Sequence, residues 1–88
     1  MNRNEILKPF AEKLGISIDD LISKKRNHHL TDARKIICND LRKKGLTLHE
    51  IGFILKKDHT TVIYNIRAYK DYYQFNPKFK KLANKTNE

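Results

Sequence analysis

Residues 57–67 read KDHTTVIYNIR, and the helix that this stretch predicts decides the fold. Asp58 has the short acceptor side chain of a helix N-cap, because its carboxylate can accept a hydrogen bond from an unpaired amide one turn on. We therefore expect a helix that begins at His59. Its apolar residues recur at three- and four-residue spacing and form one packing face, made of Val62, Ile63, Ile66 and Tyr69. The other face offers outward the polar group His59, Thr60, Tyr64 and Arg67.

The first turn of this helix has an unusual composition. His59, Thr60 and Thr61 carry short hydrogen-bonding groups, and the two threonines also carry methyl groups. These residue types have poor helix propensity, but they suit the base edges of a DNA major groove, where imidazole can donate or accept and a methyl group can contact thymine. The composition therefore favours a recognition helix.

A second, shorter helix is predicted immediately upstream, where residues 47–55 read TLHEIGFIL. Thr47 and Glu50 have the spacing of a capping box. An apolar stripe follows, formed by Leu48, Ile51, Ile54 and Leu55. Two lysines separate this helix from Asp58, which is the outline of a helix-turn-helix, and Gly52 is placed where two such helices would approach closely.

The stretch LTLHEIGFILKKDHTTVIYNIR, residues 46–67, resembles the C-terminal DNA-binding domain of DnaA, the bacterial chromosomal replication initiator. The D-H-T-T-V string at 58–62 matches the signature of that family. The likeness extends back through DLISKKR at 20–26 and DARKIICNDL at 32–41, and so covers residues 5–70 in order. It implies an all-α fold, a compact multi-helix bundle that contains a helix-turn-helix as in DnaA domain IV and the Trp repressor.

Composition agrees with a polyanion as partner. The 88 residues, 1–88, predict a single domain with a modest core. The 19 basic and 10 acidic residues give a net charge of +9, most of which lies in residues 23–70, with 12 basic and 4 acidic groups. Residues 1–22 hold 3 basic and 4 acidic groups. Such a distribution predicts an attraction to nucleic acid that weakens as the salt concentration rises.

Other classes of protein are disfavoured. The one cysteine, Cys38, excludes an internal disulfide and a cysteine-based zinc site, and the four histidines lack the i, i+4 spacing of zinc ligands on a helix. The sequence shows no glycine-rich phosphate loop and no nucleophile or acid/base constellation. We therefore expect no enzyme, no metal and no cofactor or nucleotide. Without a long apolar run we also expect no membrane partner and a cytoplasmic, nucleoid-associated location.

Elsewhere in the chain, apolar periodicity and capping residues predict four further helical segments. These are residues 4–14, ended by Gly15, where Pro9 favours a later start or a bend; 18–22, capped by Ser17; 32–44, capped by Thr31 and ended by Gly45; and a segment from Pro77 in which Phe79 and Leu82 dock, with a frayed tail at 84–88. The recognition helix should continue to Phe75, and its three tyrosines, Tyr69, Tyr72 and Tyr73, should pack against the first helix.

Residues 23–30, SKKRNHHL, have no apolar period and predict a basic loop. A solvated charge run remains an alternative. The resemblance implies that this loop enters the minor groove and that Arg26 reaches into it, where a flat guanidinium fits a narrow A/T-rich groove. In the helix at 32–44 a basic side is expected from Arg34, Lys35, Arg42 and Lys43, although complementing the helix dipole would explain the last two equally well.

The candidate contacts follow from the pattern and the resemblance together. We expect base contacts from Asp58, His59, Thr60 and Arg26. We expect phosphate contacts from Lys24, Lys25, Arg34, Lys35, Arg42, Thr61 and Arg67.

The predicted function is sequence-specific binding of double-stranded DNA at a DnaA-box-like site, regulating replication or transcription, with possible competition against full-length DnaA. The 88 residues leave no room for the ATP-binding motor domain of DnaA, so we expect no ATP hydrolysis from them. The turn also departs from the family, since KKD at 56–58 replaces the usual G-G-R-D. The alternative is a basic interaction module that binds RNA or acidic proteins without sequence specificity.

Overall fold

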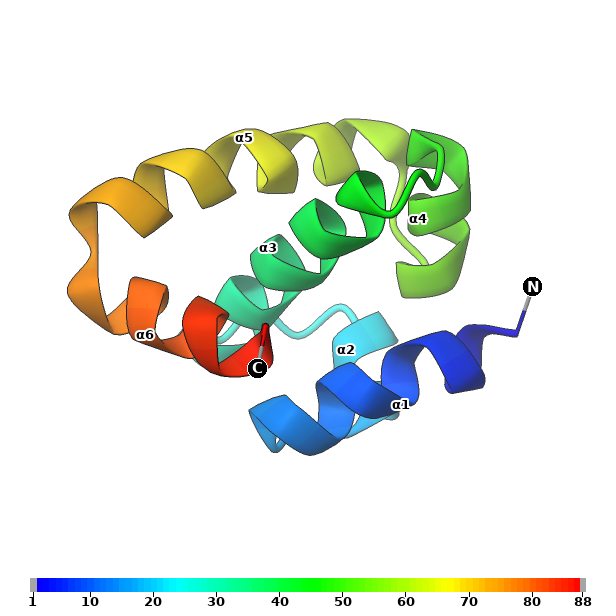
Figure 1. The fold of residues 1–88 in the computed structure, drawn as a ribbon. Helices are drawn as coiled ribbons and strands as arrows, with labels where there is room; N and C mark the ends of the chain where they lie inside the picture. Colours follow the sequence, from blue (N-terminus) through cyan, green and yellow to red (C-terminus); the bar gives the residue numbers. More distant parts are fainter. Residues whose placement is uncertain (1, 88) are drawn as a thin grey trace.

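Six α-helices make up the computed structural model, which describes residues 2–87 and contains no strand in that range (Figure 1). The helices are α1 (Arg3–Leu14), α2 (Ile18–Ile22), α3 (His28–Lys43), α4 (Leu48–Leu55), α5 (His59–Phe75) and α6 (Pro77–Thr86). The all-α prediction, with a helix-turn-helix near the middle of the chain, is confirmed. None of the described helices is long and apolar enough to cross a membrane.

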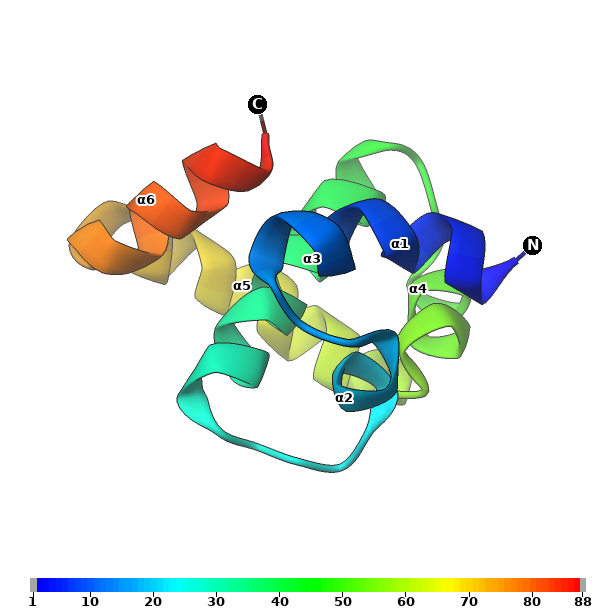
Figure 2. The ribbon, with the colours of Figure 1, turned by 90° about the horizontal axis from the view of Figure 1, so that it is seen from below.

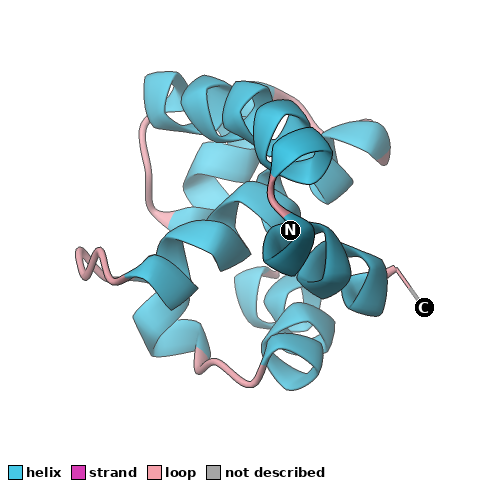
Figure 3. Ribbon diagram, turned by 90° about the vertical axis from the view of Figure 1, so that its left-hand side faces the viewer, coloured by secondary structure: helices cyan, strands magenta, loops and turns pink. Residues whose placement is uncertain are grey.

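The helices surround one hydrophobic cluster, with α3 at its centre. α5 packs along α3, α4 lies beside the start of α5, and α6 folds back from the end of α5 toward α1 (Figures 1 and 2). The connections within the described range are short (Figure 3). Each helix contributes at least one fully buried apolar side chain, namely Leu7, Leu21, Ile37, Ile51, Val62 and Phe79.

Every helix begins at a residue with a short polar side chain. In each case the side-chain oxygen accepts a hydrogen bond from a backbone amide three residues on, which satisfies one of the unpaired donors of the first turn. The six N-caps are Asn2, Ser17, Asn27, Thr47, Asp58 and Asn76. The caps predicted at Ser17, Thr47 and Asp58 are confirmed, and Thr47 with Glu50 forms the complete capping box.

The predicted start of one helix is wrong, whereas the helix predicted at 4–14 agrees with α1 within one residue. α3 begins at His28 because Asn27 is its N-cap, with its Oδ1 3.0 Å from the amide of Leu30, so Thr31 lies inside the helix. The basic loop is therefore shorter than predicted and ends before His28. α1 begins at Arg3 and keeps Pro9 in its interior, without the later start that this proline favours.

The C-terminal hairpin also differs from the prediction. Tyr69 and Tyr72 pack edge-on against Phe79 of α6, with ring centroids 5.5 Å apart in both pairs, so α6 provides the packing partner expected from the first helix. α6 runs to Thr86, whose side chain is buried and whose carbonyl accepts a hydrogen bond from Nζ of Lys13 at 3.0 Å. Residues 84–86 are thus helical rather than frayed, and Glu88 lies outside the described residues.

Cys38 is a buried free thiol at the interface of α3 and α5. Burial raises the pKa of this thiol to about 12, and the side chain of Asn65 hydrogen-bonds to it. Asn65 is itself buried on the packing face of α5, where the sequence predicted apolar residues alone.

The turn between α4 and α5 depends on close backbone contact. The amide of Lys57 donates to the carbonyl of Gly52 at 2.9 Å, and a Cβ atom at Gly52 would lie 2.5 Å from the Lys57 carbonyl oxygen. The sequence predicted a close approach of the two helices at Gly52, and the structure places the close contact one step earlier, with the backbone of the turn at Lys57 and Asp58. Lys56 ends α4 in the left-handed region, at φ 54°, a conformation in which a side chain is disfavoured.

We expect Gly52→Ala to lower the free energy of unfolding by about 1–3 kcal/mol, because the added methyl group would collide with a backbone carbonyl that cannot rotate away. Urea unfolding followed by circular dichroism measures this change. A midpoint equal to that of the wild type would contradict the contact between α4 and the turn.

We expect the opposite result for Lys56→Gly, which should raise the free energy of unfolding by about 0.5–1 kcal/mol, since glycine adopts positive φ without a steric penalty. The same urea experiment measures it. Lys44→Gly is the comparison, because it removes a lysine at a helix end where φ is −77°. It also removes the ion pair between Lys44 and Asp40, so it should give no gain. An equal gain from both variants would assign the effect to charge.

Candidate nucleic-acid interface

The start of α5 presents three of the four predicted base contacts together. Asp58, His59 and Thr60 are all exposed. Oδ1 of Asp58 accepts from the Thr60 hydroxyl at 2.6 Å and from the Thr61 amide at 2.9 Å. These hydrogen bonds, that of Thr60 first, lower the pKa of the Asp58 carboxyl, so at neutral pH it is a charged acceptor. The first turn is thus both capped and solvent-facing.

His49 extends this surface onto α4. Its ring lies 5.1 Å, centroid to centroid, from the ring of His59, so the starts of the two helices of the helix-turn-helix lie side by side. Sequence reasoning did not select His49, although its position one residue after the first residue of α4 was a usable signal. Within residues 2–87, no three potential metal-ligating side chains gather.

A groove lies between the basic loop with the start of α3 on one side and the turn with α5 on the other. Its lining includes six cations and one carboxylate. The lining residues are Lys24, Arg26, Thr31, Arg34, Lys35, Lys56, Lys57, Asp58, Thr61, Tyr64, Asn65 and Tyr72. Of the predicted site residues, the groove brings together Lys24, Arg26, Arg34, Lys35, Asp58 and Thr61.

Three predicted phosphate contacts lie outside this groove. Lys25 pairs with Asp20, with Nζ 3.2 Å from Oδ1, while its side chain stays largely exposed. Arg42 is exposed near the end of α3 and donates to the carbonyl of Leu46 at 2.9 Å. Arg67 is exposed on the outer side of α5, as predicted. Their contact with phosphate remains a prediction.

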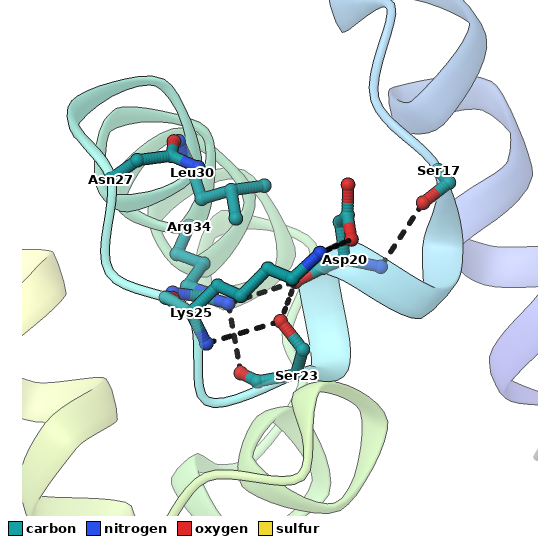
Figure 4. Close-up of polar contacts among 7 residues, drawn as sticks. All are labelled: Ser17, Asp20, Ser23, Lys25, Asn27, Leu30 and Arg34. Atoms are coloured by element: carbon teal, nitrogen blue, oxygen red, sulfur yellow. Dashed lines mark hydrogen bonds and ion pairs between the residues drawn. The ribbon is translucent and has the colours of Figure 1, made fainter.

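Arg34 does not lie on an exposed basic side, and this expectation is corrected. Only 4% of the residue is exposed. Four of its N–H groups donate to carbonyls at the end of α2 and in the following loop. Figure 4 shows Arg34 beside Asp20, Ser23 and Lys25, which supply three of these carbonyls. The acceptors are Leu21 at 2.9 Å, Lys25 at 2.6 Å, Asp20 at 2.9 Å and Ser23 at 2.9 Å. Burial lowers the pKa of Arg34, and its donors hold the loop in place.

Lys35 is buried too, so it also leaves the predicted basic side. Its Nζ lies 4.5 Å from the centroid of the Tyr72 ring and 3.8 Å from Oδ1 of Asp32. Burial lowers the pKa of Lys35, while Asp32 opposes that shift. Only 4% of Lys35 is exposed, and its ammonium already contacts Tyr72 and Asp32. Lys35 therefore packs within the fold, at the back of the groove.

Hydrogen bonds of the Ser23 side chain fix the shape of the loop. The Ser23 hydroxyl donates to the carbonyl of Asp20 at 2.7 Å and accepts from the amide of Lys25 at 3.2 Å (Figure 4). Lys24 and Arg26 remain exposed on this turn. A turn held at both ends differs from a freely solvated charge run, and it presents two cations at the rim of the groove.

Lys57 connects the helix-turn-helix to the loop, and sequence reasoning missed it. Its Nζ donates to the carbonyls of Ser23 at 2.7 Å, Ile22 at 3.4 Å and Leu55 at 3.4 Å. Burial, followed by the charge of Arg34, lowers the pKa of Lys57. No spacing pattern could have found this contact, because the partners are 34 and 35 residues away in the chain.

The sequence of the chain is similar to those of known proteins. The family described as the bacterial dnaA protein helix-turn-helix matches residues 4–68. The chromosomal replication initiator protein DnaA of Aquifex aeolicus is 38% identical over 81 residues, which cover 90% of this chain and 20% of that protein. DnaA of Thermodesulfovibrio yellowstonii is 43% identical over 61 residues, covering 67% of this chain and 14% of that protein.

DnaA of Thermosipho melanesiensis is 33% identical over 64 residues, which cover 72% of this chain and 15% of that protein. The chain thus spans a fifth or less of the length of these curated relatives. The family match includes the basic loop, α4, the start of α5 as far as residue 68, and every residue of the groove lining except Tyr72. On this evidence the chain belongs to the family of bacterial DnaA helix-turn-helix domains.

Proposed function

We propose that the chain binds double-stranded DNA sequence-specifically, at sites like the DnaA box. The first turn of α5 enters the major groove, and the loop at 23–27 enters the adjacent minor groove. One observation carries the proposal: Asp58 and Thr61 at the start of α5 line the same groove as the exposed loop cations Lys24 and Arg26. His59 and Thr60, between Asp58 and Thr61 in the chain, are exposed. Membership of the DnaA helix-turn-helix family supports DNA binding by this face.

The electrostatics of the groove suit a phosphate backbone passing between the two readout elements. Lys24, Arg26 and Lys56 are exposed at its rim, and Asp58 is the one carboxylate in its lining. Tyr64 adds an aromatic side chain that is 62% exposed, which can pack on deoxyribose. Phosphate contacts then fall to Lys24, Lys56 and Thr61 in the groove and to Lys25, Arg42 and Arg67 beside it.

Binding at such sites would make the chain a regulator of replication or transcription. By occupying DnaA-box-like sites, the chain would compete with full-length DnaA for them by mass action. Since the chain matches a fifth or less of its DnaA relatives, the activity of those whole proteins does not belong to this proposal.

Selection of duplexes from a random pool, followed by competition at two salt concentrations, tests the proposal. A preferred short duplex should outcompete a scrambled duplex, single strands and RNA at both salt concentrations. Equal competition by all four nucleic acids would instead support a basic module without sequence specificity.

We expect His59→Ala and Thr60→Ala each to weaken binding to the selected duplex by about 1–3 kcal/mol, because each removes a base contact. Binding to scrambled DNA should change little. Thr60→Val keeps the methyl group but loses the hydroxyl that donates to Asp58, so it separates a thymine contact from hydrogen bonding. Gln74→Ala, exposed near the far end of α5, is the control. Undiminished discrimination in both alanine variants would show that this turn does not read bases.

Arg26→Ala should weaken binding to duplexes with A/T-rich flanks more than binding to duplexes with G/C-rich flanks, because a narrow minor groove attracts arginine most strongly. Arg42→Ala, as its counterpart outside the groove, should weaken all duplexes equally and lower the salt slope by about 1. Fluorescence anisotropy titrations on both duplexes measure these quantities. Equal losses on the two flanks for Arg26→Ala would reduce its role to surface charge.

A further inference from the structure

We propose that Lys57 is a positioning residue that fastens the minor-groove loop to the turn of the helix-turn-helix, so that the loop and the recognition helix meet DNA as one rigid unit. The inference rests on the proposed function and deepens it. Lys57 lines the groove of the protein that we propose faces DNA, and the inference gives it an internal structural role in place of a phosphate contact.

The contact that carries the inference is a carbonyl shared by two cations. The carbonyl of Ser23 accepts from Nζ of Lys57 at 2.7 Å and from NH2 of Arg34 at 2.9 Å. Ser23 caps the end of α2 and lies three residues before Arg26. The donors come from two different elements, the turn after α4 and the helix α3, so this one carbonyl joins three parts of the fold.

The surroundings of the ammonium favour an internal role. A lysine ammonium has three N–H donors, and Nζ of Lys57 faces three backbone carbonyls, those of Ser23, Ile22 and Leu55. The residue is half-buried. Its neighbour Lys56 is exposed, lines the same groove and makes no such contacts in the described chain, so a phosphate meets Lys56 first.

The position of Arg26 depends on this fastening. A duplex fixes the distance between adjacent major and minor grooves, so two readout elements bind together only when their separation is fixed as well. Arg34 holds the loop to α3, whereas Lys57 alone among these donors holds it to the turn that leads directly into α5. Loss of the Lys57 ammonium leaves the charge of Arg26 intact, but the position of Arg26 relative to His59 is then no longer fixed.

The first experiment needs no DNA. Amide hydrogen exchange by NMR is measured in the wild type, Lys57→Met and the matched control Lys56→Met, which removes the adjacent, exposed charge. Lys57→Met should speed exchange of the hydrogen-bonded amides of Ser23 and Lys25 by about tenfold, as expected for the loss of one charge-assisted hydrogen bond. Core amides of α3 should keep their wild-type rates, as should both loop amides in Lys56→Met. Unchanged exchange of the loop amides in Lys57→Met would overturn the inference.

The second experiment is a double-mutant cycle between Lys57→Met and Arg26→Ala on duplexes with A/T-rich and G/C-rich flanks. If Lys57 acts through Arg26, Lys57→Met removes most of the preference for A/T-rich flanks, and the double variant is no worse than Arg26→Ala alone. The salt slope of Lys57→Met should equal that of the wild type, whereas Lys56→Met should lower it by about 1. Additive losses together with a lower salt slope for Lys57→Met would make it a phosphate contact.

The two experiments separate the possible failures. A wild type that prefers no duplex would refute the proposed function, but the exchange rates of Ser23 and Lys25 would still decide whether Lys57 holds the loop. Sequence-specific binding together with unaltered exchange in Lys57→Met would uphold the function and refute the positioning role.

Discussion

The candidate interface depends on the hydrogen bonds between the buried guanidinium of Arg34 and the backbone carbonyls of α2 and the following loop. α2 has five residues, too few for a helix to persist on its own, and its last carbonyls have no partner within the helix. Arg34 supplies four hydrogen bonds to these carbonyls and to the loop that follows. Burying a charge is unfavourable, and here nearly all of its donors are satisfied by backbone oxygens at a helix C-terminus, where the dipole attracts a cation. The loop therefore has a defined shape before any partner binds.

The six cations that line the groove fall into two groups, one that holds the fold together and one that is exposed to solvent. Arg34, Lys35 and Lys57 point into the fold and hold its parts together, whereas Lys24, Arg26 and Lys56 face solvent. Net charge counts both groups equally, although only the solvent-facing group releases counterions when a polyanion binds. The salt dependence of binding should thus be smaller than the charge of this segment suggests, since half of the groove cations are already engaged by backbone carbonyls or rings.

How much the sequence predicted follows from the range of each interaction. Thr47 and Asp58 act on amides three residues away, so their caps, the two helices and the tight approach at Gly52 could all be derived from spacing. Arg34 acts on backbone carbonyls 9 to 14 residues away, and Lys57 on carbonyls 34 and 35 residues away. Backbone carbonyls carry no sequence signal, so these roles could not be read from composition or period. The start of α3 was missed for a different reason. Asn27 and Thr31 are both good caps four residues apart, and the burial of Leu30 decides for Asn27.

The turn between α4 and α5 holds one residue in a strained conformation. Lys56 adopts a left-handed conformation that disfavours a side chain by about 1–2 kcal/mol. The same position places an ammonium at the rim of the groove, next to Lys57, which holds the loop. Glycine at this position would remove the backbone strain but would also remove the positive charge. Stability therefore favours glycine here, whereas electrostatic attraction to a phosphate favours lysine. Because the ammonium of Lys57 is bonded to carbonyls, Lys56 is the residue of the turn whose charge stays exposed to solvent and available to a phosphate.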